Sequence, residues 1–189
     1  MPGEVRALTV GPPPTLNPLR SRLSFFLPAV LLLAGDVATK LAVYRTLSLS
    51  RGPIPVLGEW IRLNYVHNPD AAFGLFHGSR WFFIGVSTLS ILVILALAVG
   101  RRYQDLWMRL ALGLILGGAV GNLLDRIWLG VVIDFLDVGL GAHRWPIFNV
   151  ADCGVTVGVI LLGLRLLSEG RAEDHATGLD GEAETGHGG

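Results

Sequence analysis

Charged residues are scarce in this chain. Asp, Glu, Lys and Arg make up 16% of its 189 residues, whereas 51% are hydrophobic and the mean hydropathy is +0.55. Because a soluble domain carries about 25% charged residues, this composition excludes an ordinary soluble protein and indicates an integral membrane protein. The formal net charge is +0, so no excess of positive charge would attract nucleic acid, and we expect no nucleic-acid partner.

Cysteine and metal-binding patterns are also scarce. The single cysteine, Cys153, excludes an intramolecular disulfide and any zinc site built on several thiolates. The five histidines form no H-x-x-H or H-E-x-x-H spacing, so a metal-dependent mechanism has no support. We therefore expect neither a metal nor a cofactor.

Four hydrophobic segments are long enough to cross a bilayer, which takes about 20 apolar residues. Flanking stretches rich in Pro, Gly and polar residues predict disordered cytoplasmic tails over residues 1–22 and 168–189, around a four-helix membrane domain over 23–167. No Ala-x-Ala site closes the first segment, so we expect a retained helix and not a cleaved signal peptide. The four segments span residues 23–44, 81–99, 106–128 and 147–167.

Two of the connections between these segments have strand-like patterns. Residues 61–66 alternate apolar and polar side chains after a short apolar stretch at 54–58, and residues 131–138 are rich in β-branched residues. A small sheet at the membrane surface would satisfy these backbones without exposing them to lipid. The predicted fold class is an all-α integral membrane protein with four transmembrane helices and a small extracytoplasmic β element.

Basic residues near the segment ends predict the orientation. Cytoplasmic loops carry an excess of Lys and Arg, and arginines cluster where both termini and the short second link would lie together. The opposite side also carries arginines, so the bias is modest. Both termini are therefore expected in the cytoplasm, on the evidence of Arg20, Arg22, Arg101, Arg102, Arg109, Arg165 and Arg171.

Several ionisable residues lie inside or beside the apolar segments. An ionisable side chain at the bilayer centre costs at least about 2.5–3.5 kcal/mol, so each such residue is a functional-site hypothesis by default. Residues three or four positions apart share one face of a helix. Three groups have this spacing: Asp36 with Lys40; Asn122 with Asp125 and Arg126; and Asn149 with Asp152.

Glycines at intervals of four predict that these helices approach one another closely. Gly113, Gly117 and Gly121 form one such series in the third segment, and Gly154 with Gly158 repeats it in the fourth. Small residues at these intervals let helix backbones come into contact. The polar faces can therefore converge on one site.

Convergence decides between a structural and a catalytic interpretation of the acids. Taken singly, each ion pair can serve only to join helices, but six acids and amides map to the outer half of the bundle. Two aspartates sharing such a site can hydrolyse a peptide without a metal, because one takes a proton from water while the other polarises the carbonyl. The six are Asp36, Asn122, Asp125, Asp134, Asn149 and Asp152, whereas Asp137 is expected to be a solvated loop acid.

Two other functions remain open from the residues alone. The first is a proton- or ion-coupled carrier, although such carriers favour inverted repeats and broken helices, and no internal repeat is apparent. The second is a non-catalytic membrane scaffold with ion-paired helices. Asparagine in place of the acids distinguishes the three functions.

Five ordered sequence blocks resemble those of lipoprotein signal peptidase, the bacterial type II signal peptidase of aspartic peptidase family A8. The resemblance covers about residues 23–167, with matching order and spacing. The blocks are Asp36-x-x-Thr-Lys40, Asn68-Pro-Asp-Ala-Ala-Phe-Gly74, Gly117-Gly-Ala-x-Gly-Asn-x-x-Asp-Arg126, Val131-Val-Ile-Asp-Phe135 and Phe148-Asn-x-Ala-Asp152.

The resemblance implies a membrane-embedded aspartyl endopeptidase of the bacterial cell membrane. Such enzymes remove signal peptides from diacylglyceryl-modified prolipoproteins by cleaving before the lipidated cysteine at the outer face, and globomycin blocks them. The implied partners are these substrates and membrane lipid, and we expect a monomer.

The resemblance also assigns roles to the site residues. It places the catalytic dyad at Asp134 and Asp152, with Asp125 as the main rival for the first position. Asp125 and Arg126 are instead expected to brace the site, with Arg126 also placed to contact substrate carbonyls.

The remaining matched residues are expected to support the site or bind substrate. Asn68, Asn122 and Asn149 would hold the substrate backbone or orient the acids, and Asp36 and Lys40 would line the entrance or stabilise the first helix.

The chain departs from the family pattern at three positions. Asp70 stands where the family usually has Gly, and it adds a possible negative charge beside the site. Cys153 replaces a more usual Ser and Ile133 a Val, and both exchanges conserve size.

Overall fold

The structure is a computed structural model that describes residues 18–47, 52–69, 80–99 and 105–185. Its helices and strands are, in chain order, α1 (Pro18–Thr46), β1 (Ile54–Leu57), β2 (Ile61–Asn68), α2 (Arg80–Val99), α3 (Leu106–Trp128), β3 (Val132–Leu140), β4 (His143–Arg144) and α4 (Val150–Thr185). Within the described residues, four helices are long and apolar enough to cross a membrane. This part of the predicted fold class is confirmed.

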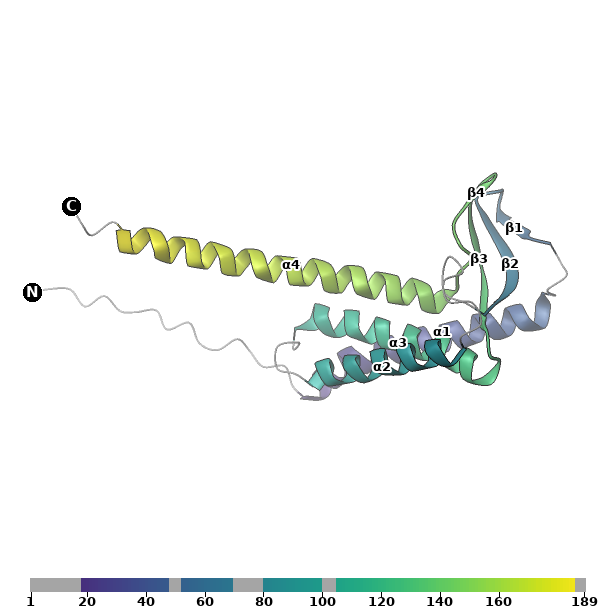
Figure 1. The fold of residues 1–189 in the computed structure, drawn as a ribbon, viewed down its shortest axis with the longest axis horizontal. Helices are drawn as coiled ribbons and strands as arrows, with labels where there is room; N and C mark the ends of the chain where they lie inside the picture. The colour runs from purple at the N-terminus through teal and green to yellow at the C-terminus, as the bar shows by residue number, and fades with distance from the viewer. Residues whose placement is uncertain (1–17, 48–51, 70–79, 100–104, 186–189) are drawn as a thin grey trace, which may run out of the picture.

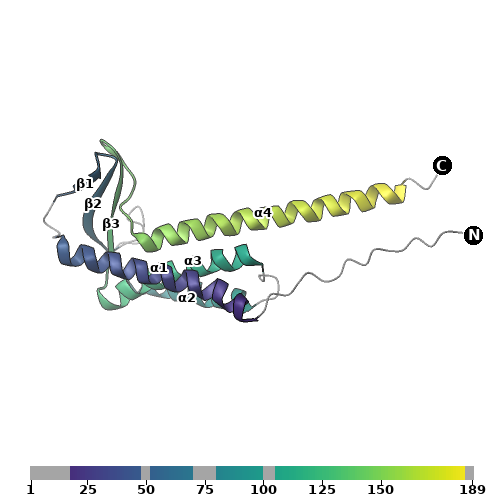
Figure 2. The same cartoon turned by 180° about the vertical axis from the view of Figure 1, so that it is seen from behind.

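The four helices run side by side, and the sheet lies across one end of them (Figures 1 and 2). Helix α3 is central, because it packs against α1, α2 and α4. About 50% of its membrane-spanning window is buried, against 22% or less in the other three helices. The membrane-spanning segment with the lowest mean hydropathy, 1.5, is therefore also the most buried of the four.

Asp105 fixes the start of α3. Its side-chain carboxylate accepts hydrogen bonds from the backbone N–H groups of Trp107, at 2.9 Å, and Met108, at 3.1 Å. This N-cap satisfies donors that the first turn of a helix would otherwise leave unpaired. Arg165 of α4 also lies 3.2 Å from the Asp105 carboxylate, so the same residue ties α4 to α3.

The glycine series of α3 brings its neighbours into backbone contact, as the sequence predicts. A Cβ atom at Gly117 would lie 2.5 Å from the carbonyl oxygen and 3.0 Å from the Cα of Ala29 in α1. One at Gly121 would lie 2.6 Å from the Oδ2 atom of Asp36. Gly118 meets the backbone of Ala151 in α4 in the same way.

The sheet has four antiparallel strands in the order β1-β2-β3-β4. Side chains alternate between its faces, so Ile133 and Phe135 of β3 pack into an apolar cluster with Val43 and Tyr65. Asp134 lies between them in sequence and belongs to the opposite face. This alternation anchors β3 on α1 while it directs Asp134 away from the cluster.

The predicted boundaries hold for two helices and differ for the other two. The predicted range for α3 is the observed one, and α2 begins one residue earlier than predicted. Helix α1 begins at Pro18, inside the predicted tail, whose residues 1–17 lie outside the described part.

Helix α4 continues to Thr185, where the sequence analysis expects a disordered tail from residue 168. Its apolar part ends at Gly170. The extension follows from helix cooperativity, because adding residues to an existing helix avoids the cost of nucleation, and Ala and Glu, good helix formers, recur in this stretch.

The expectation for Asp137 is wrong. Its side chain is 2% exposed and forms ion pairs with Arg62 of β2, at 2.7 Å, and with Arg144 of β4. Arg62 and Asp137 are register partners across β2 and β3, so strand pairing itself brings the charges together. Although burial opposes it, hydrogen bonds from Arg144 and Arg62 hold the pKa of Asp137 below its usual value.

Candidate active site

Asp134 and Asp152 line one polar pocket at the sheet end of the bundle. Asp134 comes from β3 and Asp152 from the first turn of α4, and the pocket has a volume of about 340 Å³. The other residues that line it are Asn68, Asn122, Arg126, Val132, Trp145, Pro146, Ile147, Phe148 and Thr156. Five of the nine predicted site residues line this pocket. A sixth, Asn149, does not line it but forms hydrogen bonds with both Asp134 and Asp152.

Asp134 is almost fully buried, with 2% of its surface exposed. Its Oδ1 atom accepts a hydrogen bond from Asn149 Nδ2, at 2.7 Å, and its Oδ2 atom accepts one from Asn68 Nδ2, at 2.8 Å. Burial raises the pKa of Asp134 to about 7; the charge of Asp152 adds to this, and the two amide donors oppose it. The carboxyl group can therefore hold or release a proton near neutral pH.

Asp152 is held by the start of its own helix. Asn149 and Asp152 form a reciprocal cap: the Asp152 N–H donates to Asn149 Oδ1, at 3.0 Å, and the Asn149 N–H donates to Asp152 Oδ2, at 3.1 Å. This arrangement is a capping box built from Asn and Asp. The second oxygen, Oδ1, accepts from Asn122 Nδ2, at 2.7 Å, so both oxygens of Asp152 receive N–H donors.

Asn149 bridges the two aspartates and is fully buried. Besides its bonds to both carboxylates, its Nδ2 atom lies 3.0 Å from Asn122 Oδ1 and 3.3 Å from the carbonyl oxygen of Ile133. One amide side chain thus fixes β3, α3 and α4 relative to one another. The role expected for Asn122 and Asn149, to orient the acids or hold the substrate backbone, stays a prediction, and the structure gives each of them a hydrogen bond to at least one of the two aspartates.

Lys40 occupies the buried space behind the pocket. Its ammonium group lies 2.7 Å from Asp36 Oδ2, 2.8 Å from Asp125 Oδ2 and 3.1 Å from Asn122 Oδ1. Lys40 is 4% exposed and Asp36 is 0% exposed, and neither lines the polar pocket. From the sequence, the pair is expected either to line the entrance of the site or to stabilise the first helix; the structure places it inside the bundle, away from the pocket.

The two carboxylates bound to Lys40 each hold the backbone next to Asp134 or Asp152. Asp36 Oδ1 accepts from the N–H of Ala151, at 2.9 Å, and Asp125 Oδ2 accepts from the N–H of Ile133, at 3.2 Å. Asp125 faces Lys40 and β3 and not the pocket. Asp125 is not among the residues that line the polar pocket.

Arg126 points its guanidinium group along the pocket wall. Its Nη1 atom donates to the carbonyl oxygen of Asn122, at 3.2 Å, and the guanidinium carbon lies 5.1 Å from the centre of the Phe83 ring. A cation over an aromatic face is electrostatically favourable. These contacts hold the charge beside the pocket.

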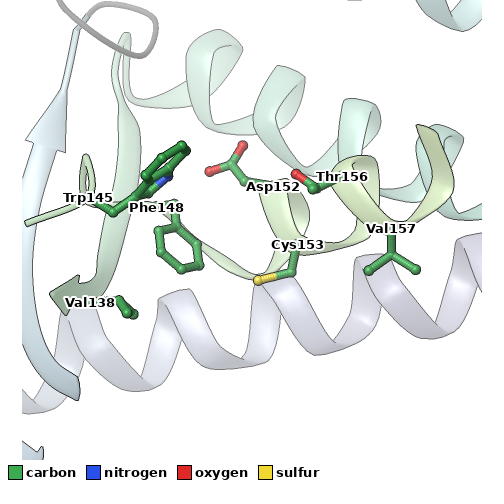
Figure 3. A pocket seen from close by; sticks show the side chains of 7 residues that line it. All are labelled: Val138, Trp145, Phe148, Asp152, Cys153, Thr156 and Val157. Carbon is green, nitrogen blue, oxygen red and sulfur yellow. The ribbon is translucent and has the colours of Figure 1, made fainter. Parts of the chain in front are cut away.

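A second, apolar pocket adjoins the polar one at Asp152 (Figure 3). It has a volume of about 530 Å³, and Trp145, Phe148, Asp152 and Thr156 line both pockets. Its remaining lining residues are Val138, Cys153 and Val157. The carboxylate of Asp152 therefore stands where a polar space meets an apolar one.

Sequence reasoning missed Trp145 and Thr156. Thr156 follows Asp152 by four residues, so helical spacing was a usable signal for it. Trp145 follows a two-residue strand for which no periodic pattern exists. Asp70 and most of its sequence block lie outside the described residues, so the expectation about that loop stays untested. Among the residues described, no three His, Cys, Asp or Glu side chains are grouped so as to hold a metal ion.

Comparison with known proteins decides the family. The sequence profile of signal peptidase (SPase) II matches residues 28–168. The chain belongs to the signal peptidase II family. A lipoprotein signal peptidase from Moorella thermoacetica is 43% identical over 145 residues, which cover 77% of this chain and 93% of that protein. One from Desulforapulum autotrophicum is 41% identical over 147 residues, 75% of this chain and 90% of the relative.

Solved structures agree with the family assignment. A bacterial membrane enzyme determined by the in meso method superposes with a TM-score of 0.73 at 28% identity, covering 82% of this chain and 92% of that one. A second has a TM-score of 0.70 at 29% identity, covering 81% and 96%. This chain therefore has the fold of these membrane enzymes: in its described residues, four helices long enough to cross a membrane and a small antiparallel sheet.

Proposed function

We propose that this chain is a membrane-embedded aspartyl endopeptidase that removes signal peptides from diacylglyceryl-modified prolipoproteins. The observation that carries the proposal is the pairing of Asp134 and Asp152. They come from different elements and line one pocket, and both accept hydrogen bonds from Asn149: Asp134 from its side-chain amide and Asp152 from its backbone N–H. The membership in the signal peptidase II family supports the same substrate class.

The dyad hydrolyses the peptide bond by sharing protons. Asp152, ionised, takes a proton from a water molecule, and the water oxygen attacks the scissile carbonyl carbon. Asp134, protonated, gives its proton to the carbonyl oxygen. When the C–N bond breaks, Asp152 gives its proton to the leaving nitrogen and Asp134 takes back the proton as the new carboxyl group forms. Both aspartates return to their starting states.

The apolar pocket suits a lipid-modified substrate. It borders Asp152 directly (Figure 3), so an apolar part of the substrate can lie beside the scissile bond. On the polar side, Arg126 and Asn68 line the space through which the peptide backbone would pass. Cleavage just before a lipidated cysteine requires this juxtaposition of polar and apolar space.

We place the sheet and the site at the outer face of the bacterial cell membrane, with both termini in the cytoplasm. The apolar parts of α3 and α4 carry Arg109 and Arg165 near their ends opposite the sheet, as expected for a cytoplasmic side. Aromatic side chains favour both lipid–water boundaries: Trp107 is exposed at the end opposite the sheet, and four more exposed tryptophans lie at the sheet end. They are Trp60, Trp81, Trp128 and Trp145, each at least 62% exposed.

The test is cleavage by the purified full-length protein in detergent, with EDTA and without added metal. The substrate is a diacylglyceryl-modified prolipoprotein, and the control is the same precursor without the lipid. The proposal predicts a single new N-terminus at the lipidated cysteine, found by mass spectrometry, and no cleavage of the control. Absence of cleavage by folded protein would favour a carrier or a scaffold.

A further inference from the structure

Lys40 has an unusual environment for a buried cation. An ammonium group has three N–H donors and no acceptor, and three oxygens face this one, from Asp36, Asp125 and Asn122. Two of the three are carboxylates, which compensate its charge. The third is a neutral amide oxygen that neutralisation does not require.

The amide contact fixes which way Asn122 points. The oxygen and nitrogen of an Asn side chain differ in hydrogen bonding but hardly in shape. Because Lys40 cannot accept a hydrogen bond, the Asn122 oxygen must face it, at 3.1 Å. The Asn122 nitrogen then has to face Asp152 Oδ1, at 2.7 Å.

Asn149 is a second donor to the same oxygen. It presents its nitrogen to Asn122 Oδ1, at 3.0 Å, and to Asp134 Oδ1, at 2.7 Å. Its oxygen accepts from the backbone N–H of Asp152, at 3.0 Å. These contacts form a relay that ends at Asp152: Lys40 and Asn149 both donate to the Asn122 oxygen, and the Asn122 nitrogen donates to Asp152 Oδ1.

We propose that Lys40 is a positioning residue that fixes this relay so that Asp152 receives N–H donors on both oxygens and serves as the base of the dyad. The inference rests on the proposed function and deepens it by assigning the two aspartates different roles. Asp152 also lies in the first turn of α4, where the helix dipole favours negative charge. Asp134 lies in a strand and has no such support.

The charged surroundings of Asp152 come from every element packed around it. Lys40 and Asp36 face the site from α1, Asp125 and Arg126 from α3, and Asp134 from β3. On α4 itself the neighbouring thiol is Cys153. A test must therefore change the relay without changing the net charge of this group.

The double variant Lys40→Met with Asp36→Asn meets this condition. In the native protein the two carboxylates and one ammonium leave one net negative charge, and in the double variant Asp125 alone leaves the same charge. The matched control is Asp36→Asn alone, which keeps Lys40 against Asn122. The measurement is kcat/KM against pH for cleavage of the diacylglyceryl-modified precursor by full-length protein in detergent.

Without Lys40, only the neutral amide of Asn149 donates to the Asn122 oxygen, so the charged donor that fixes the Asn122 side chain is lost and its bond to the Asp152 carboxylate weakens. The acidic limb of the profile should then move to higher pH, by up to about one pH unit, since a weaker donor stabilises an ionised carboxylate less. The control should keep its limb at or below the native position. A slower double variant whose limb stays at the native position would overturn the proposal, because the net charge of the group is the same in both proteins and a purely structural lysine changes the rate alone.

A second double variant keeps the proposal testable if the first one does not fold. Lys40→Gln with Asp36→Asn keeps a polar side chain, but its amide can present either end to Asn122. A neutral amide donates a weaker hydrogen bond than an ammonium group, so this variant should shift the limb in the same direction by a smaller amount, and an unshifted limb contradicts the proposal. The dyad itself is tested separately. Active Asp134→Asn or Asp152→Asn variants would refute the proposed function. If these two variants are inactive but the Lys40 variants keep the native pH profile, only the inference about Lys40 is refuted.

Discussion

Asp134 and Asp152 are the same amino acid in two environments, and the difference predicts a pH profile. Asp134 is the buried acid whose pKa is raised to about 7, and in the proposed mechanism it must carry a proton when catalysis begins. Activity should therefore fall as pH rises through about 7, because an acid with a raised pKa loses its proton there. The measurement is kcat/KM for precursor cleavage across neutral pH, read as a property of the coupled pair.

The Asn68→Ala variant gives that profile a specific check. Asn68 Nδ2 donates to Asp134 Oδ2, at 2.8 Å, and this bond lowers the pKa of Asp134 against the effect of burial. Removing the donor should move the alkaline limb further up, toward higher pH. If the alkaline limb moves to lower pH, or does not move although the variant is active, then Asp134 is not the group whose loss of a proton produces that limb.

At the level of single residues, the sequence identified the acids better than their partners. Residues spaced three or four apart on one helix could be grouped directly, and Asn149 with Asp152 is an example. One partner of Asp137, Arg62, lies 75 positions away in sequence; the other, Arg144, lies seven positions away on the next strand, a spacing that no helix or strand period predicts. A buried acid and a solvated acid therefore look alike until the strand register is known.

The crossing of α1 and α3 depends on Gly117. A methyl group at this position would meet the backbone of Ala29, which cannot move without displacing α1. We expect Gly117→Ala to destabilise the fold by about 1–3 kcal/mol, the usual cost of overpacking, and to slow cleavage by displacing Asp36 and Lys40. Thermal unfolding in detergent and the cleavage rate measure the two effects.

Gly163 of α4 provides the matched control, because a Cβ atom there would have nothing within 4 Å. Gly163→Ala should leave both quantities unchanged. Equal losses in the two variants would mean that helix flexibility, and not the α1–α3 contact, explains the result.

The sheet depends on the ion pairs of Asp137 with Arg62 and Arg144, which join β2, β3 and β4. Asp137→Asn should lower the free energy of unfolding by about 1.5–3 kcal/mol, as expected for hydrogen bonds to a charged group. Because the pKa of Asp137 is lowered in the folded state, this stabilisation is present above the unfolded pKa and is lost as pH falls through the folded one. The difference between variant and native protein should therefore shrink on acidification.

Thermal unfolding of both proteins at neutral and acidic pH measures this difference. A difference that grows on acidification would contradict the assignment of a stabilising carboxylate.

The helices with long apolar segments could be predicted from the sequence, but their ends could be predicted only where a local signal marks them. Helix α3 has a capping residue, Asp105, at its start and ends before Gly130, so both boundaries could be identified. Helix α4 has a glycine, Gly170, at the end of its apolar part, yet it continues to Thr185, so a glycine alone does not predict where a helix ends. The pairing of Val66 with Asp134 depends on which distant strands meet, which the chain does not show locally.

At the scale of the whole molecule, the proposed orientation can be tested with the cysteine content. Cys153 is the only cysteine, so Cys153→Ser provides a cysteine-free background for single cysteines at Glu59 and Gly170. Glu59 lies in the turn between β1 and β2 and is 69% exposed, whereas Gly170 follows the apolar part of α4. A maleimide that cannot cross the membrane should label Glu59→Cys in spheroplasts and label Gly170→Cys only after lysis.

The reverse labelling pattern would place the sheet in the cytoplasm. It would contradict the placement of the site at the outer face of the membrane. It would not affect the proposed dyad, because the geometry of Asp134 and Asp152 does not depend on which side the sheet faces.

The most direct test of the account compares three asparagine variants of the full-length protein: Asp134→Asn, Asp152→Asn and Asp125→Asn. Each is assayed with the diacylglyceryl-modified precursor in EDTA, and globomycin binding reports folding. The account predicts that the first two lose about 10²–10⁴-fold in kcat yet still bind the inhibitor, while Asp125→Asn, whose carboxylate faces Lys40, keeps measurable activity. An active Asp134→Asn variant beside an inactive Asp125→Asn variant would contradict the assignment of the dyad.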